Sequence, residues 1–450
     1  MKDPTLDKGT EVQGLWTAVL FPSIDLFDGS PRKGTGPLTP IVGVSLFQRT
    51  VLTLQRAGIR QLIVLSGPEE DQLKQSLLKG PKVTIPVRWM PIREFPLDDI
   101  STWEALAAEI RGFCLLSGVS TIFSLSLIEE LRRDVRSGQA IVVGPGVVER
   151  LGGNVGIADV IVMPASELAA AGKLAAECDA VPIGRWLERA AADGRLLVLP
   201  SERDDRSQWY QPVHVQADVR EAERRLYSSL KGEFEGFVDR YFNRALSQWC
   251  TRVFLALGWS PNAITILATV VGLLAAAGFA MGSYAAGVGA ALLFQCAAVL
   301  DCSDGEVARL TFTESAFGAW LDIALDNVVH MAIFGGIAVG AAKAAGTDDG
   351  WIPLALGASA IFGNALSFSL VNRAKKIQAA SEWKTPLHAS WSDFMLKNVA
   401  SRDFSVVVLL FAVFAKLELF LWLAAIGSMA FAGAMVWVVR PAAVRMRSSA

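Results

Sequence analysis

Four aspartates stand in two closely spaced pairs within residues 301–326, DCSDGEVARLTFTESAFGAWLDIALD. Asp301 and Asp304 are three residues apart and Asp322 and Asp326 are four apart, so each pair would share one face of a helix. Both pairs border long apolar stretches, and charged side chains at membrane depth are rare and usually functional. A fold-back at the turn between the pairs would place the two helices side by side and bring the four carboxylates together.

Carboxylates gathered at membrane depth repel one another strongly because a low dielectric magnifies the repulsion. Hard divalent cations relieve this repulsion, and they take oxygen ligands. Two metal ions bridged by carboxylates can hold a pyrophosphate and stabilise both the attacking and the leaving oxygen of a displacement. A remaining carboxylate can take the proton from a hydroxyl nucleophile. The residue types and their spacing therefore indicate metal-assisted transfer of a phosphate-containing group to a hydroxyl.

The aspartates belong to a longer pattern of fixed residues, D-x2-D-G-x2-A-R-x8-G-x3-D-x3-D. With average residue usage, eight such identities arise by chance on the order of once per billion starting positions. The pattern resembles the signature of the CDP-alcohol phosphotransferases, also called CDP-alcohol phosphatidyltransferases, and the resemblance covers about residues 236–440. The eight matching residues are Asp301, Asp304, Gly305, Ala308, Arg309, Gly318, Asp322 and Asp326.

The resemblance implies a role for each part of this signature. Asp301, Asp304 and Asp322 would bind two divalent ions, Mg²⁺ or Mn²⁺, and Asp326 would act as the base and as a further metal ligand. Arg309 would face a phosphate, which suits the planar guanidinium group. The residues expected to line the site for the CDP group are Asn262, Thr265, Asp304, Gly305, Ala308, Arg309 and Gly318.

The reaction implied by the resemblance moves a phosphoalcohol from a CDP-alcohol to an acceptor hydroxyl and releases CMP. The donor would be CDP-diacylglycerol or a CDP-polyol, and a polyol phosphate is a plausible acceptor, as in phospholipid or polyol-phosphodiester synthesis. Membrane lipids and a second copy of the chain are the other implied partners. Two alternatives explain fewer of the residues, namely a cation-coupled membrane transporter and a catalytically silent membrane anchor.

Five polar residues outside the signature admit two interpretations each. Asn262 either lines the CDP site or caps a helix. His330 either contacts the acceptor or a carboxylate near the metal, or is a hydrogen-bonded polar residue without a role in the reaction. Arg373, Lys376 and Arg402 either bind an anionic substrate group, or set the membrane topology and contact lipid phosphates.

The composition of the chain divides near residues 200–225. Hydrophobic residues make up 52% of the 450 residues and charged residues 19%, whereas soluble proteins carry about a quarter charged residues. The apolar excess falls after about residue 249. The net charge of -2 argues against nucleic-acid binding, and the five cysteines form no pattern typical of a zinc site or a disulfide framework.

Six apolar segments in the C-terminal half approach the length that a membrane-spanning helix needs, about 20 residues. They are residues 262–281, 285–300 with its polar extension, 315–342, 351–371, 404–415 and 419–439. The fifth is short, and a re-entrant or surface helix is the alternative there. Lysines and arginines in alternate links predict a multi-pass protein of a prokaryotic cytoplasmic membrane with both termini in the cytoplasm. The polar first residues lack the apolar core of a signal peptide, which fits this orientation.

The N-terminal half predicts a layered α/β domain because strand-like and helix-like runs alternate along it. Residues 36–67, GPLTPIVGVSLFQRTVLTLQRAGIRQLIVLSG, resemble the nucleotide-sugar pyrophosphorylase-like nucleotidyltransferases. Such domains occur fused to phosphotransferases that use CDP-inositol-type donors. The architecture therefore resembles proteins of the inositol-phosphate cytidylyltransferase/di-inositol-phosphate-phosphate synthase type.

The residues that such nucleotidyltransferases use for chemistry are missing from this sequence. Their phosphate-binding lysine falls at residues 35–36, Thr-Gly, and their two metal carboxylates fall at residues 118–119, Gly-Val, and within residues 212–216, PVHVQ. The resemblance thus implies an inactive fold with a scaffold or binding role. An unorthodox active loop within residues 22–33 is the alternative. Its candidate residues are Asp25, Asp28, Arg32 and Lys33.

Together these patterns predict three parts. Residues 1–217 form a nucleotidyltransferase-like α/β domain, and residues 251–450 form an all-α bundle of six transmembrane helices. Residues 218–250 connect them and end in an amphipathic helix on the membrane surface, because apolar residues recur there at helical spacing among charged ones.

Overall fold

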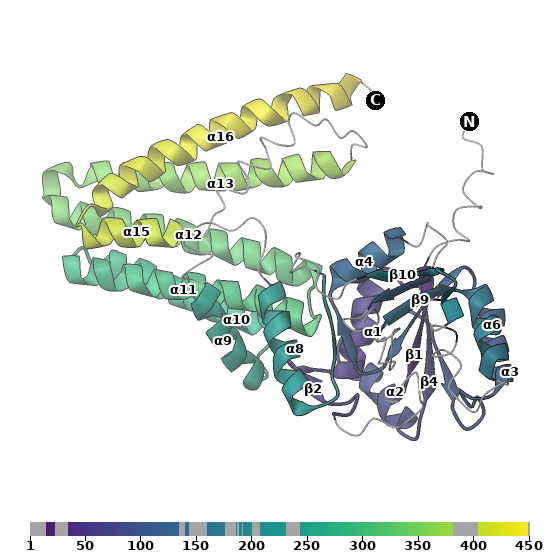
Figure 1. The fold of residues 1–450 in the computed structure, drawn as a ribbon. Coiled ribbons are helices and arrows are strands. Elements are labelled where there is room, and N and C mark those ends of the chain that lie inside the picture. The colour runs from purple at the N-terminus through teal and green to yellow at the C-terminus, as the bar shows by residue number, and fades with distance from the viewer. Residues whose placement is uncertain are drawn as a thin grey trace. The chain divides into compact units, whose positions relative to one another are not determined.

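The chain folds into two compact units, Met1–Leu230 and Lys231–Ala450, in a computed structural model (Figure 1). The described residues are 15–22, 35–134, 140–143, 160–175, 186, 189–190, 192–199, 208–230, 244–380 and 404–448. Helix α8, Gln216–Ser229, belongs to the first unit, and its residues Val219 and Leu226 are buried. The segment 218–250, expected to be one connector, is therefore divided between the two units.

The first unit is built on a mostly parallel sheet of seven strands in the order β10-β8-β9-β6-β1-β4-β5. Its strands are β1 Leu15–Phe21, β4 Gln61–Ser66, β5 Val87–Pro91, β6 Phe113–Gly118, β8 Ala140–Val143, β9 Val160–Pro164 and β10 Leu196–Leu199. Strand β9 runs antiparallel to both neighbours, and the other pairs are parallel. Four short strands form two small sheets, β2 Pro40–Ile41 with β3 Val44–Ser45, and β7 Thr121–Phe123 with β11 Tyr210–Pro212.

Helices cover both faces of this sheet because its central strands are apolar on both sides. Ala18 and Leu20 of β1 lie in one buried cluster, while Val19 and Phe21 of the same strand lie in another. The first cluster includes residues of α1 Leu46–Arg56, α2 Glu70–Leu78 and α4 Leu125–Asp134, and the second includes residues of α3 Ile100–Glu109 and α6 Ala165–Ala175. The sheet thus separates two hydrophobic cores, and the predicted α/β class is confirmed.

The second unit consists of helices joined by short turns in its described residues, without a strand among them. Its helices are α9 Arg244–Ala256, α10 Pro261–Phe279, α11 Tyr284–Thr311, α12 Ala316–Asp349, α13 Trp351–Ala380, α15 Phe404–Val413 and α16 Leu417–Ser448. Five of them contain stretches long and apolar enough to cross a membrane, namely α10, α11, α12, α13 and α16.

The number of candidate spans among the described residues is thus five, whereas the sequence predicted six. The expected fifth span, residues 404–415, corresponds to α15, which has 10 residues. At about 1.5 Å per residue such a helix covers roughly half of a hydrocarbon core about 30 Å thick. The described part of α15 is thus too short to count as a span, and the sixth crossing stays a prediction.

Glycines on α12 allow its backbone to touch that of α10. A Cβ atom added at Gly336 would lie 2.2 Å from the carbonyl oxygen of Ala276, and one at Gly340 would lie 2.1 Å from that of Phe279. Small residues four apart are typical of close helix pairs in membranes, where association depends on packing rather than on the exclusion of water. This contact fixes α12 against α10 and so determines where the first turns of α12 lie.

The close approach makes Gly336 far less tolerant of a methyl group than its neighbour. We expect Gly336→Ala to destabilise the second unit by on the order of 1–3 kcal/mol through overpacking. Gly335→Ala is the matched control, because a Cβ there would meet only Ile361 Cδ1, at an ordinary contact distance of 3.8 Å. Thermal unfolding of both variants in detergent micelles compares them, and equal unfolding midpoints would contradict the proposed contact.

Candidate metal centre

A short turn joins α11 to α12 and brings the two aspartate pairs to neighbouring helix ends. Phe312 is the C-cap residue of α11. It adopts the left-handed conformation with φ of 58°, which ends the helix. Ser315 caps the start of α12, where its Oγ accepts a hydrogen bond of 3.0 Å from the backbone N–H of Gly318. The predicted fold-back is present, but both helices pack mainly on α10 rather than along each other.

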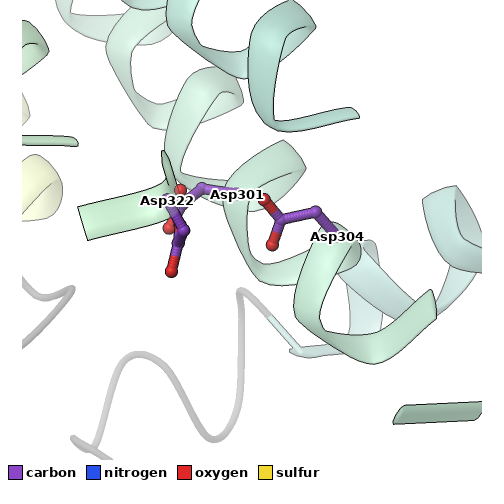
Figure 2. A group of neighbouring side chains, drawn as sticks. All are labelled: Asp301, Asp304 and Asp322. Carbon is purple, nitrogen blue, oxygen red and sulfur yellow. The ribbon is translucent and has the colours of Figure 1, made fainter. Parts of the chain in front are cut away.

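Three of the four signature aspartates converge at this point. Ligand oxygens of Asp301, Asp304 and Asp322 all lie within 4.8 Å of one another. Figure 2 shows their carboxylates directed toward a common region, with Asp301 and Asp304 on α11 and Asp322 on α12. Asp304 is buried, while Asp301 and Asp322 are half-buried. The arrangement is a compact group of hard oxygen ligands at the ends of two helices.

The first turns of α10 complete the surroundings of this group. Thr265 donates a hydrogen bond from its Oγ1 to Oδ2 of Asp304 and so fixes the orientation of that carboxylate. Asn262 lies beside the first turn of α12, since a Cβ added at Gly318 would come within 3.2 Å of its Oδ1. Ser260, not Asn262, caps α10, which excludes the capping interpretation of Asn262. The starts of α10 and α12 therefore meet the end of α11.

Gly305 and Arg309 lie one helical turn apart on α11 and are in contact. A Cβ added at Gly305 would lie 3.2 Å from Nη1 of Arg309, so the guanidinium group lies over the glycine. The side chain of Arg309 is exposed, and Ala308 beside it is half-buried. The missing side chain of Gly305 thus lets the guanidinium group of Arg309 lie against the backbone of α11.

Asp326 lies outside the group of three carboxylates. It is one turn further along α12, its side chain is about half exposed, and its Oδ1 is 3.3 Å from Nδ1 of His330. The same Nδ1 is 3.0 Å from the backbone oxygen of Asp326. The His330 ring also makes edge contacts with Phe294 and Phe404. His330 thus contacts the carboxylate of Asp326, and whether it takes part in the reaction stays a prediction.

Glu306 is a polar residue of this region that the sequence analysis did not select. It occupies a variable position of the signature, two residues after Asp304, and only 2% of it is exposed. Its carboxylate accepts hydrogen bonds from Ser247 and Thr251 of α9. The available signal was a further acidic residue within an apolar helix, which is costly unless it has partners.

The expected basic cluster can be followed only in part. Arg373 lies on α13 and is exposed. Lys376 belongs to the same helix, but its side chain lies outside the described residues, as does the whole of Arg402. Whether these residues meet a substrate therefore stays a prediction.

The first unit also brings together the three segments at which the sequence analysis expected the residues of a nucleotidyltransferase site to be missing. The backbone N–H of Thr35 donates to the carbonyl oxygen of His214, that of Val213 donates to Ser120, and that of Val119 donates to Phe21. Residues 35–36, 118–119 and 212–216 are thus connected around the ends of β1 and β6. Residues 23–34, which hold the alternative active loop, lie outside the described residues.

Two solved structures illustrate what the chain resembles. Phosphatidylinositol phosphate synthase of Mycobacterium tuberculosis, in complex with manganese and citrate, is 20% identical, covers 43% of this chain and 88% of its own, and has a TM-score of 0.33. A nucleotidyl transferase from Methanothermobacter thermautotroptrophicus is 17% identical, covers 48% of this chain and 100% of its own, and has a TM-score of 0.36.

Curated relatives are similar over shorter stretches. The bifunctional IPC transferase and DIPP synthase of Aquifex aeolicus is 33% identical over 134 residues, which is 29% of this chain and 30% of the relative. The protein of the same name from Archaeoglobus fulgidus is 35% identical over 138 residues, 30% of this chain and 26% of the relative. Archaetidylinositol phosphate synthase of Pyrococcus horikoshii is 34% identical over 89 residues, 20% of this chain and 46% of the relative. The chain thus spans less than half the length of each of these relatives.

The helical unit itself matches a family model. Residues 259–446 match the model described as CDP-alcohol phosphatidyltransferase, and this stretch runs from the start of α10 into the last part of α16. It contains all eight residues of the signature and the three converging carboxylates. The C-terminal unit of this chain is therefore similar to the CDP-alcohol phosphatidyltransferase family over residues 259–446.

Proposed function

We propose that the protein is a membrane enzyme that transfers a phosphoalcohol from a CDP-alcohol to an acceptor hydroxyl and releases CMP. The observation that carries this proposal is the convergence of Asp301, Asp304 and Asp322 from two helices within a complete family signature. Charged side chains next to apolar membrane-length helices are costly. A reaction that needs bound cations explains why three carboxylates are kept together there.

The three carboxylates fit a site for Mg²⁺ or Mn²⁺. All three offer the oxygen ligands that hard cations take, and their ligand atoms lie within 4.8 Å of one another. The hydrogen bond from Thr265 orients Asp304 before any ion binds, which reduces the cost of assembling the site. Divalent ions held there would offset the negative charge of the donor's pyrophosphate. Two ions, as the family resemblance implies, are part of this proposal.

The neighbouring residues are suited to holding the CDP group. Arg309 is exposed and presents a planar group that pairs well with phosphate oxygens. Because Gly305 and Gly318 carry no side chain, Arg309 and Asn262 can approach the helix backbone closely at these positions. We propose that Arg309 moves from Gly305 onto a donor phosphate when the CDP-alcohol binds.

Asp326 is the proposed base. Its position one turn beyond Asp322 and its partly exposed carboxylate place it beside the metal group without making it part of that group. The acceptor oxygen would form a bond to the phosphorus that carries the alcohol, while the bond from that phosphorus to the bridging oxygen of CMP breaks. The acceptor proton passes to Asp326, and CMP leaves with the bridging oxygen. His330 would hold the Asp326 carboxylate in place through Nδ1.

The donor and acceptor are proposed by class. Both a CDP-diacylglycerol and a CDP-polyol fit a site that recognises the shared CDP group. The name of the Pyrococcus horikoshii relative contains an inositol phosphate, so an inositol phosphate is our first choice of acceptor. A homodimer is a further expectation, which rests on the family resemblance alone.

We propose that the five candidate spans cross a prokaryotic cytoplasmic membrane with both chain termini in the cytoplasm. The lysines and arginines of alternate links support this orientation. Helix α15 would enter the membrane as the sixth member of the bundle. Its residues Val408 and Ala412 are buried in the same cluster as residues of α11 and α12, which supports its place in the bundle.

A cation-coupled transporter is the main rival. It accounts for carboxylates in a membrane but not for the glycines and Arg309 at the fixed spacing of the signature. A silent anchor for the first unit is the second rival, and it gives no reason to keep a costly group of acidic residues together. Release of CMP distinguishes the enzyme from both.

The full chain, purified in detergent, is expected to release CMP from at least one donor of a panel that contains CDP-diacylglycerol and CDP-inositol. Inositol phosphate, glycerol phosphate and inositol serve as acceptors, and mass spectrometry identifies the product. Chelation of divalent metal should abolish the release and Mn²⁺ should restore it, because the carboxylates hold the donor through bound cations. Metal-dependent ion flux into vesicles without any CMP would favour the transporter.

Two aspartates one turn apart on α12 should behave differently when each is changed to asparagine. We expect Asp326→Asn to lower the rate of transfer about 10²–10⁴-fold and to keep Mn²⁺ binding, since the variant loses only the base. Asp322→Asn should lose both, because Asp322 belongs to the metal group. Mn²⁺ binding by electron paramagnetic resonance and CMP release by chromatography separate the two effects. Near-normal turnover in Asp326→Asn would show that another group takes the proton.

We also propose that the first unit is an inactive nucleotidyltransferase fold with a scaffold or binding role. The three connected segments 35–36, 118–119 and 212–216 lack the lysine and carboxylates that such chemistry needs. The full-length Asp326→Asn variant, incubated with CTP, Mg²⁺ and a panel of sugar and polyol phosphates, should release no pyrophosphate above background. Release that depends on both CTP and a polyol phosphate would instead point to the loop at residues 22–33.

A further inference from the structure

Helix α9 precedes the candidate spans and packs against α11 at the segment that carries the metal group. Its residues Ser247 and Thr251 are fully buried, and Phe254 lies in a buried cluster with Val307 of α11. Its opposite face exposes Trp249 and Val253. Helix α9 therefore contacts the rest of its unit through one face only.

The polar part of this contact is centred on Glu306. Its Oε1 accepts a hydrogen bond of 2.9 Å from Ser247 Oγ, and its Oε2 accepts one of 2.8 Å from Thr251 Oγ1. Because the two donors are four residues apart, one carboxylate spans a full turn of α9. A third polar contact joins the same two helices, because Ser303 Oγ donates a hydrogen bond of 3.3 Å to the carbonyl oxygen of Ser247.

These contacts fix both the position of α9 along α11 and the rotation of α11 about its own axis. On a helix of 3.6 residues per turn, Ser303 and Glu306 project to a different side from Asp301 and Asp304. A carboxylate held by two hydroxyls on α9 therefore supports α11 from behind, within the same turn as Asp304. Rotation or sliding of α11 would break both hydrogen bonds to Glu306. The same movement would displace the carboxylates of Asp301 and Asp304, because they lie on the same helix.

We propose that Glu306 is a positioning residue that docks α9 onto α11 and thereby holds Asp301 and Asp304 in the geometry that binds divalent metal. It touches neither the metal nor the substrate in this role. The consequence for catalysis rests on the proposed function, whereas docking and metal binding can be measured without any substrate.

Docking is read out by the half-buried thiol of Cys250 on α9. The other four cysteines, Cys114, Cys178, Cys296 and Cys302, are first replaced by alanine. In the full chain at a temperature well below unfolding, Glu306→Ala is expected to raise the rate of maleimide labelling of Cys250 about tenfold, because α9 separates from α11. The double variant Ser247→Ala/Thr251→Val removes the two donors on α9 and should raise the labelling rate of Cys250 by a similar factor. Adding Glu306→Ala to this double variant should raise the labelling rate little further, because the same contact is already lost.

Metal binding is measured on the same variants by titration with Mn²⁺ alone. Residues that orient metal ligands typically contribute 10- to 100-fold to metal affinity, so Glu306→Ala should raise the half-saturating Mn²⁺ concentration at least about tenfold. Glu306→Gln should restore much of the affinity, because a carboxamide can accept from one hydroxyl and donate to the other. Glu418→Ala, at an exposed position on α16, is the control and should leave affinity and labelling unchanged.

Two results would overturn the inference. Unchanged Mn²⁺ affinity in Glu306→Ala despite faster labelling would mean that docking of α9 does not position the metal ligands. Loss of affinity in Glu306→Gln equal to that in Glu306→Ala, with labelling unchanged, would mean that the charge of Glu306 acts on the metal directly. If the wild-type chain binds Mn²⁺ as expected but transfers no phosphoalcohol, the proposed function fails and this inference stands.

Discussion

The second unit is organised around one electrostatic constraint, that several carboxylates lie close together at the end of membrane helices. Like charges at such short range repel strongly where the dielectric is low, so the fold must force them together and a counter-charge must offset the repulsion. Asp301, Asp304 and Asp322 meet this constraint with oxygens within 4.8 Å of one another. The remaining features of the unit can be understood as the scaffold that holds this group.

The scaffold works through contacts that are individually local. Gly336 and Gly340 let α12 touch the backbone of α10, and Thr265 of α10 binds Asp304 of α11. Helix α10 is therefore the common reference to which both carboxylate-bearing helices are fixed. Glu306 adds a second support for α11 from α9. A displacement of any one helix would reach the carboxylates through these contacts, because packed helices move as rigid bodies.

The first unit presents the opposite relation between fold and chemistry. Its sheet buries both faces in separate apolar cores, and this burial depends on β-strands such as β1 rather than on any residue of an active site. The fold of this unit therefore does not depend on whether catalytic residues are present. Segments 35–36, 118–119 and 212–216 are still connected by backbone hydrogen bonds, which tolerate any side chain.

The sequence by itself determined what depends on periodicity and local spacing. The shared face of Asp301 and Asp304 follows from the helical repeat of 3.6 residues, and the bounds of most spans follow from the length of the continuous apolar segments. Only the tertiary structure decided which helix ends meet. It brought Asn262 beside Gly318 and gave Glu306 its partners on α9, because such contacts depend on how helices pack across long separations in sequence.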